Sequence, residues 1–273
     1  MNNVFSLLAL EYAKFRKSAV IGLLTISFAI MMPTVIFVGK EFKNLPKPLP
    51  GNEIFFNFPT VWDYLGYAGS WLVFFFLGLI SVFIVVNEVS FKTFRQNIII
   101  GLTRRTYFLS KVYSIIAISL LATLYYSIIG FGIGAVHATE FSITDAFSDT
   151  SWAIPRFFLM TLGYTSFGLL CGFLLRRSGI AVLFYLCYIL MIEPLIKWAV
   201  HFRFFKNETV NYYPLNSIED LMPNPLFRFA DLIPRKDLDF SFLLTYQQAT
   251  LSSIVWIVIF LGLAYYSFIK RDI

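Results

Sequence analysis

The strongest constraint on this chain is a series of long apolar runs that contain no charged residue. The clearest run covers residues 65–86 and leads directly into a polar segment that begins at Asn87. About 20 apolar residues, rising ~1.5 Å each, cross a bilayer hydrocarbon core of ~30 Å. This run therefore predicts a membrane-spanning helix, and we expect an integral membrane protein.

Five further apolar runs give the chain its expected architecture, and the run at 178–200 carries Glu193 and Lys197 near its end. The predicted spans are residues 18–38, 65–86, 112–136, 157–175, 178–200 and 249–269. A hydrophobic content of 58%, against 14% charged residues, is far from the composition of soluble domains. We predict an all-α integral membrane protein in which residues 1–273 form a single six-span domain.

The distribution of Lys and Arg predicts the orientation of these spans. Segments on one side carry twelve of them, whereas the short loops on the other side carry three. Cytoplasmic connections hold the excess of positive charge, so we predict that both termini are cytoplasmic. Five more lie in the long connection 201–248, where the rule holds less strictly. The net charge of +6 then reflects topology and anionic lipid, and no nucleic-acid partner is expected.

Several classes of active site are not supported by the sequence. A Gly-x-x-x-x-Gly-Lys-Ser/Thr phosphate-binding loop does not occur in the sequence. Any ATPase that drives this protein must therefore be a separate partner. His137 and His201 have no neighbouring ligand residues, the acidic residues are scattered, and Cys171 and Cys187 lie singly in apolar runs. We predict no catalytic, cofactor-binding or metal site in this chain.

The segment 1–17 predicts a helix that lies in the membrane interface. Its apolar side chains gather on one helical face, at Val4, Phe5, Leu8, Tyr12 and Phe15. Such a face packs into the boundary between head groups and acyl chains. The alternative is an ordinary juxtamembrane helix with no role in coupling.

The polar segment 87–111 between the second and third predicted spans is the strongest functional signal. Phe91, Phe94 and Ile98 recur at helical spacing, while the charged residues among them face elsewhere. A short amphipathic helix is predicted, ending at Gly101. The alternative is a basic cytoplasmic loop that lies on lipid head groups.

The order of residue types in this segment resembles the coupling segment of type 2 ABC exporter permeases. The motif consists of Glu88, the pair Lys92-Thr93, the run Gly101-Leu102-Thr103-Arg104, and Lys111. Residues 87–99 look like the variant of that family found in Bacteroidota-type bacteria. Many members carry proline where this chain has Leu102.

This resemblance implies a six-span permease subunit of the bacterial inner membrane that pairs with a second permease subunit. A separate ATPase subunit would bind ATP and magnesium, and the cargo would be amphiphilic, lipid-like or a peptide. The residues implied in contact with the ATPase or framing that contact are Glu88, Phe91, Lys92, Thr93, Phe94, Arg95, Gln96, Arg104 and Lys111. The rival hypothesis is a non-transporting scaffold that passes ATPase work to an external partner.

The connection 201–248 contains four prolines and cannot form one continuous helix. The resemblance implies short re-entrant helices here, with candidate pieces at 218–222 and 225–232, and the alternative is an external lobe without gating. The candidate outer-gate residues are Glu193, Lys197, Ile218, Leu221, Leu226 and Phe227. We expect Glu193 to pair with Lys197 as a snorkelling interface group. Arg156 is expected to be an interface anchor.

Overall fold

The computed structural model describes residues 3–41, 55–90, 102–137, 152–205, 207–225 and 243–270. All regular structure in these residues is helical, and six of the helices are long and apolar enough to cross a membrane. The prediction of an all-α, multi-pass membrane protein with six long apolar helices is confirmed.

Four of these six helices are continuous α-helices, the second and fifth contain π-helical turns, and the fourth lies at the centre of the bundle. The first is α2 (Ala19–Glu41). The second joins α3 (Thr60–Leu72), the π-helix η2 (Val73–Leu77) and α4 (Gly78–Ser90). The third is α6 (Arg104–His137), the fourth α8 (Ala153–Leu175) and the sixth α13 (Tyr246–Lys270). The fifth joins α9 (Ser178–Cys187), η4 (Tyr188–Ile192), α10 (Glu193–Leu195) and η5 (Ile196–His201), and continues into α11 (Phe202–Phe204).

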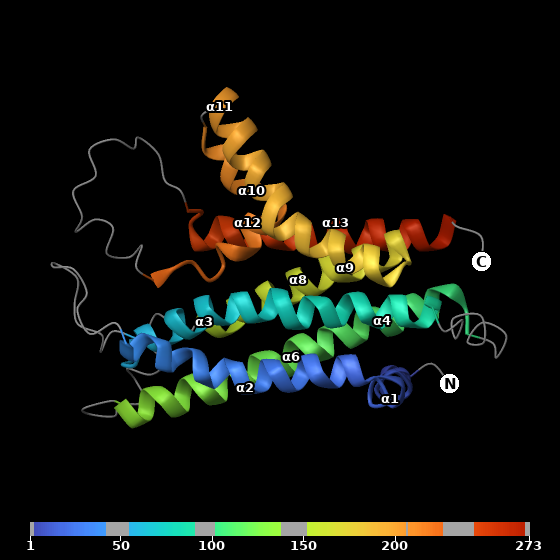
Figure 1. Ribbon diagram of the computed structural model, residues 1–273, viewed down its shortest axis with the longest axis horizontal. Coiled ribbons are helices and arrows are strands. Elements are labelled where there is room, and N and C mark those ends of the chain that lie inside the picture. Colours follow the sequence, from blue (N-terminus) through green and yellow to red (C-terminus); the bar gives the residue numbers. More distant parts are fainter. Residues whose placement is uncertain are drawn as a thin grey trace.

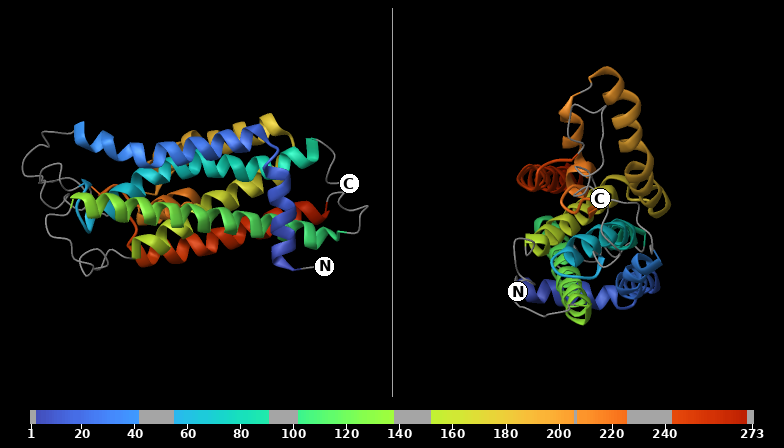
Figure 2. Two further views of the ribbon diagram at one scale, coloured as in Figure 1. Left: turned by 90° about the horizontal axis from the view of Figure 1, so that it is seen from below. Right: turned by 90° about the vertical axis from the view of Figure 1, so that its left-hand side faces the viewer.

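Three shorter helices lie at the ends of the bundle. The helix α1 (Val4–Phe15) crosses one end at a steep angle to the long helices, as Figure 2 shows. The 3₁₀-helix η6 (Glu208–Tyr212) and α12 (Pro214–Glu219) lie toward the other end (Figure 1). We refer to these two ends as the α1 end and the α12 end.

The helices α4 and α8 form the centre of the bundle because small residues let their backbones approach closely. A Cβ at Gly168 would collide with the Gly78 carbonyl oxygen and the Ser81 hydroxyl, and one at Gly172 would press on Val85. Small residues at such crossings drive helix association where no water is present. The other long helices pack around this pair and present apolar side chains outward.

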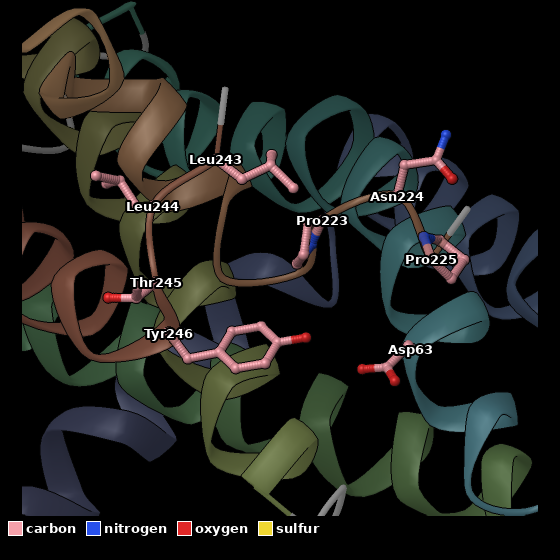
Figure 3. Close-up of a pocket in the computed structure, with 8 residues that line it drawn as sticks. All are labelled: Asp63, Pro223, Asn224, Pro225, Leu243, Leu244, Thr245 and Tyr246. Atoms are coloured by element: carbon pink, nitrogen blue, oxygen red, sulfur yellow. The ribbon is translucent and has the colours of Figure 1, made fainter. Parts of the chain in front are cut away.

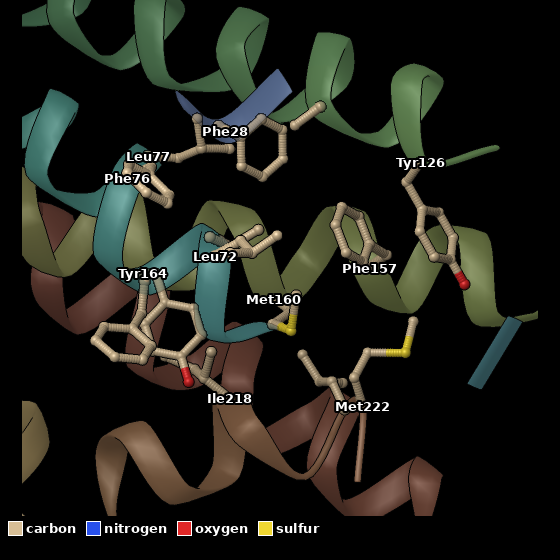
Figure 4. Packing of buried hydrophobic residues seen from close by; sticks show 14 of the residues in the cluster. Phe28, Leu72, Phe76, Leu77, Tyr126, Phe157, Met160, Tyr164, Ile218 and Met222 are labelled. Atoms are coloured by element: carbon tan, nitrogen blue, oxygen red, sulfur yellow. The ribbon is translucent and has the colours of Figure 1, made fainter. Parts of the chain in front are cut away.

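Aromatic and sulfur-containing side chains fill the core between α8, α6 and α12 (Figure 4). Tyr126 and Phe157 stack with ring centroids 4.2 Å apart. Beside them Met160 and Met222 are buried, and Ile218 reaches α8 at Gly163. This packing attaches the segment after the fifth long helix to the bundle.

The observed helix boundaries differ from the predicted ones in two places that matter for function. The third long helix begins at Arg104, eight residues before the predicted start of the span at 112. Residues 104–111 therefore belong to a continuous helix. The predicted helical piece at 218–222 is wrong, because α12 begins at Pro214 and ends at Glu219. Proline is favoured in the first helical turn, where its missing N–H needs no partner.

Candidate functional site

Four charged side chains from three helices meet at the α1 end, and we call them the four-charge cluster. They are Glu11 and Lys14 of α1, Glu88 of α4 and Lys111 of α6. The Lys111 ammonium donates to Glu11 Oε2 at 2.5 Å and also to Glu88 Oε1. Lys14 Nζ lies 3.0 Å from Glu11 Oε1 and 2.9 Å from Glu88 Oε1. Each ammonium thus bridges both carboxylates.

The four-charge cluster is largely removed from solvent. The side chain of Lys111 is 0% exposed, those of Glu11 and Glu88 are 1% and 7% exposed, and that of Lys14 is 27% exposed. Buried charges are tolerated only when they are paired and hydrogen-bonded, and the two acids here balance the two bases. This balance requires α1, α4 and α6 to be docked together.

An aromatic layer from α6, α8 and α13 supports the four-charge cluster. The ammonium of Lys111 lies 5.0 Å from the centroid of the Tyr107 ring. Tyr107 in turn stacks on Phe268 at 5.5 Å, and Phe108 contacts Phe173 at 5.5 Å. Rigid rings beneath the ammonium restrict its position, so the ion pairs are held in one geometry.

The structure brings together two of the predicted coupling residues, Glu88 and Lys111. It places a third, Arg104, against the end of α13, where Nη1 donates to the Ile269 carbonyl at 3.0 Å. A cation is favoured at this position because the last carbonyls of a helix carry partial negative charge. The other predicted coupling residues, which are Phe91, Lys92, Thr93, Phe94, Arg95 and Gln96, lie outside the described residues.

Glu11 is the functional candidate that the sequence reasoning missed. It is 1% exposed and also accepts a hydrogen bond from the Ser110 hydroxyl at 3.1 Å. The available signal was a single acid within the largely apolar run 4–13, next to Tyr12. Its partner Lys111 lies 100 positions away, and local periodicity carries no information on such a pair.

At the α12 end, Glu193 binds backbone rather than a lysine. Its Oε1 accepts from the backbone N–H groups of Leu215 at 2.9 Å and Asn216 at 2.7 Å. The side chain thereby satisfies N–H groups in the first turn of α12, which a local capping residue usually does. The predicted pairing with Lys197 is wrong, because Lys197 donates to Asn216 Oδ1. Glu193 is 3% exposed, so it does not snorkel to the interface.

A chain of hydrogen bonds continues from α12 to the start of the sixth long helix. The Asn216 amide donates to Asp220 Oδ2 at 3.2 Å, and the same oxygen accepts the Leu244 N–H at 3.0 Å. Burial raises the pKa of the Asp220 carboxyl from 3.8 to about 7, against the opposing effect of these hydrogen bonds and of Lys197. The fifth and sixth long helices are thus joined through α12.

Arg156 is a buried tether rather than the predicted interface anchor. It is 7% exposed, and its Nη2 lies 3.5 Å from Asp63 Oδ1. Its guanidinium carbon lies 3.7 Å from the centroid of the Tyr246 ring, and Nη1 donates to the Leu221 carbonyl at 3.3 Å. One side chain therefore connects α3, α8, α13 and the segment after α12. A basic residue at a helix start resembles an anchor in sequence, since its acidic partner is 93 positions away.

Two of the predicted gate residues, Ile218 and Leu221, are fully buried at the α12 end. Leu226 and Phe227 lie outside the described residues. Within the described part of the chain, no group of three or more His, Cys, Asp and Glu side chains is arranged to hold a metal ion.

Comparison with known proteins assigns no function to these residues. No protein-family model matches the chain, and a search of curated proteins found no match.

Proposed function

We propose that this chain is the permease subunit of an ATP-driven exporter in a bacterial inner membrane, coupled to a separate ATPase subunit. The observation that carries this proposal is the four-charge cluster at the α1 end. Glu88 and Lys111 lie on either side of the segment 91–101 and are joined directly by an ion pair. The helices α4 and α6 that flank that segment are therefore joined near its two ends, and α1 is bound to them through Glu11.

Joined flanking helices suit a segment that transmits movement. A partner that displaces residues 91–101 would move α1, α4 and α6 together. Separating these helices would break the four-charge cluster and leave charges buried and unpaired. A loosely held loop would absorb the same displacement. The excess of Lys and Arg at this end supports a cytoplasmic location, where an ATPase with bound ATP and magnesium would contact residues 91–96.

The α12 end supports the complementary part of the proposal. Hydrogen bonds from Glu193 and through Asp220 join the fifth and sixth long helices to α12. Relative movement of those helices would shift α12 and so open or close an outer gate. Two permease subunits would face each other across the pathway, since a paired ATPase presents one groove to each. The cargo class is amphiphilic, lipid-like or peptide.

Affinity co-purification from native membranes in mild detergent tests this assignment. We expect an ATPase subunit to co-purify with the native chain and to be lost from the variant Thr93→Asp, Phe94→Ala, Arg95→Glu. A matched control carries the same residue changes at the opposite end of the molecule, as Thr209→Asp, Phe204→Ala, Arg203→Glu, where all three side chains are exposed. Retention of the ATPase by both variants, or its absence from the native preparation, would refute the coupling role.

A further inference from the structure

A cavity of about 360 Å³ opens at the α12 end and has a defined chemical character. Its volume falls within the range of small-molecule sites in proteins. The residues that line it come from the start of α3, the segment after α12 and the segment that leads into α13. They are Asp63, Pro223, Asn224, Pro225, Leu243, Leu244, Thr245 and Tyr246 (Figure 3).

The lining combines one acid with an apolar wall. Among the described residues that line the cavity, Asp63 is the one that carries a charge, and it is 4% exposed. Figure 3 shows the Asp63 carboxylate and the Tyr246 hydroxyl directed toward each other across one side of the cavity. Two prolines and two leucines form much of the remaining wall. The polar groups are therefore concentrated on one side.

Arg156 behind the cavity is compatible with a second cation at Asp63. Its guanidinium lies 3.5 Å from Asp63 Oδ1, and its charge is shared with the Tyr246 ring and the Leu221 carbonyl. A carboxylate offers about four acceptor positions on two oxygens, so one carboxylate commonly bridges two cationic donors. Arg156 also holds Asp63 and Tyr246 in place, which gives a ligand a preorganised site.

We propose that this cavity binds the ammonium group of a small amphiphile, with the apolar stem against the prolines and leucines. A buried carboxylate favours a charged N–H donor over a neutral hydroxyl, because charge-assisted hydrogen bonds are about twice as strong. An anionic head group is disfavoured by Asp63, and the described lining residues include no basic side chain. The nearby Arg156 guanidinium is already bound to Asp63, the Tyr246 ring and the Leu221 carbonyl. An amino-lipid head group and a free alkylamine share this chemistry. The inference holds whether or not an ATPase binds the chain.

Isothermal titration of the full-length protein in a non-ionic maltoside detergent tests the proposal. The probes are octylamine, octanol and octanoate, which differ only in the head group. We expect octylamine to bind at one site per chain and at least about tenfold more tightly than octanol, since hydrogen bonds to charged groups contribute more than neutral ones. Soluble short-chain phosphatidylethanolamine, compared with its phosphatidylcholine counterpart, then separates a lipid head group from a free amine as the source.

Three variants assign the binding to this cavity. We expect Asp63→Asn to weaken octylamine binding about tenfold or more. Because that change also removes a partner of Arg156, Leu243→Trp provides a second route, filling the cavity while leaving the charge in place. Glu219→Gln, an exposed carboxyl on α12, is the matched control and should bind as the native chain does. Equal affinities for octylamine and octanol, or unchanged octylamine binding in Leu243→Trp, would overturn the proposal.

Discussion

Replacement of Lys111 by methionine tests the energetic role of the four-charge cluster. Methionine keeps much of the side-chain volume but leaves Glu11 and Glu88 buried with Lys14 as the remaining base of the cluster. Breaking a buried ion pair by removing one partner costs about 3–5 kcal/mol. At about 1.4 kcal/mol per factor of ten, the ratio of folded to unfolded protein should fall roughly 140- to 3,700-fold. Equilibrium unfolding of the detergent-solubilised protein measures this ratio.

A double-mutant cycle separates charge pairing from packing. Glu88→Gln combined with Lys111→Met restores a one-to-one balance between Glu11 and Lys14, so the loss should be smaller than the sum of the two single losses by at least ~1.5 kcal/mol. Lys17→Met, on an exposed lysine after α1, is the control and should change the free energy of unfolding by less than ~0.5 kcal/mol. A Lys111→Met loss below ~1 kcal/mol, or additivity in the cycle, would refute this reasoning.

Three further predictions concern the α12 end and the helix core. Glu193→Leu leaves buried N–H groups of α12 without their acceptor, so hydrogen exchange at Leu215 should accelerate at least about tenfold by mass spectrometry; unchanged exchange would contradict the capping role. The folded-state pKa of Asp220, about 7 against 3.8, means that the folded protein retains a proton that the unfolded chain has released. Stability should therefore fall as pH rises between these values, and the dependence of the unfolding midpoint on pH should be shallower in Asp220→Asn than in the native chain. Gly168→Leu should destabilise the α4–α8 contact by about 1–3 kcal/mol in equilibrium unfolding, whereas Gly262→Leu, where a Cβ meets nothing within 4 Å, should be neutral.

The long helices and the residues that flank the segment 91–101 were predictable because their signals are local. An uncharged run of about 20 residues has few folded solutions other than a spanning helix. Glu88 and Lys111 were identified by their order along the chain, and the structure places them in contact. Arg104 shared the same local signal, but the early start of α6 directs it to Ile269 instead.

The remaining parts of the sites depend on contacts between distant residues. Glu11 pairs with Lys111, and Arg156 pairs with Asp63. The partners are too far apart in the sequence for helical periodicity to indicate the pairing. Glu193 illustrates the same limit differently. Its partner is the backbone of α12, and a carboxylate that caps a helix from another element has no sequence spacing. The spacing of four residues to Lys197 therefore predicted the wrong bond.

Site-specific photo-crosslinking at residue 94 in native membranes tests the central proposal most directly. A photoreactive phenylalanine analogue at Phe94 should yield an adduct with a nucleotide-binding ATPase subunit, identified by mass spectrometry. The same analogue at Phe204, exposed at the α12 end, should give no such adduct. An ATPase adduct at residue 94 alone is the predicted result. Adducts at residue 94 that contain lipid or other proteins but no ATPase would contradict the assignment of this chain as an ATPase-coupled permease.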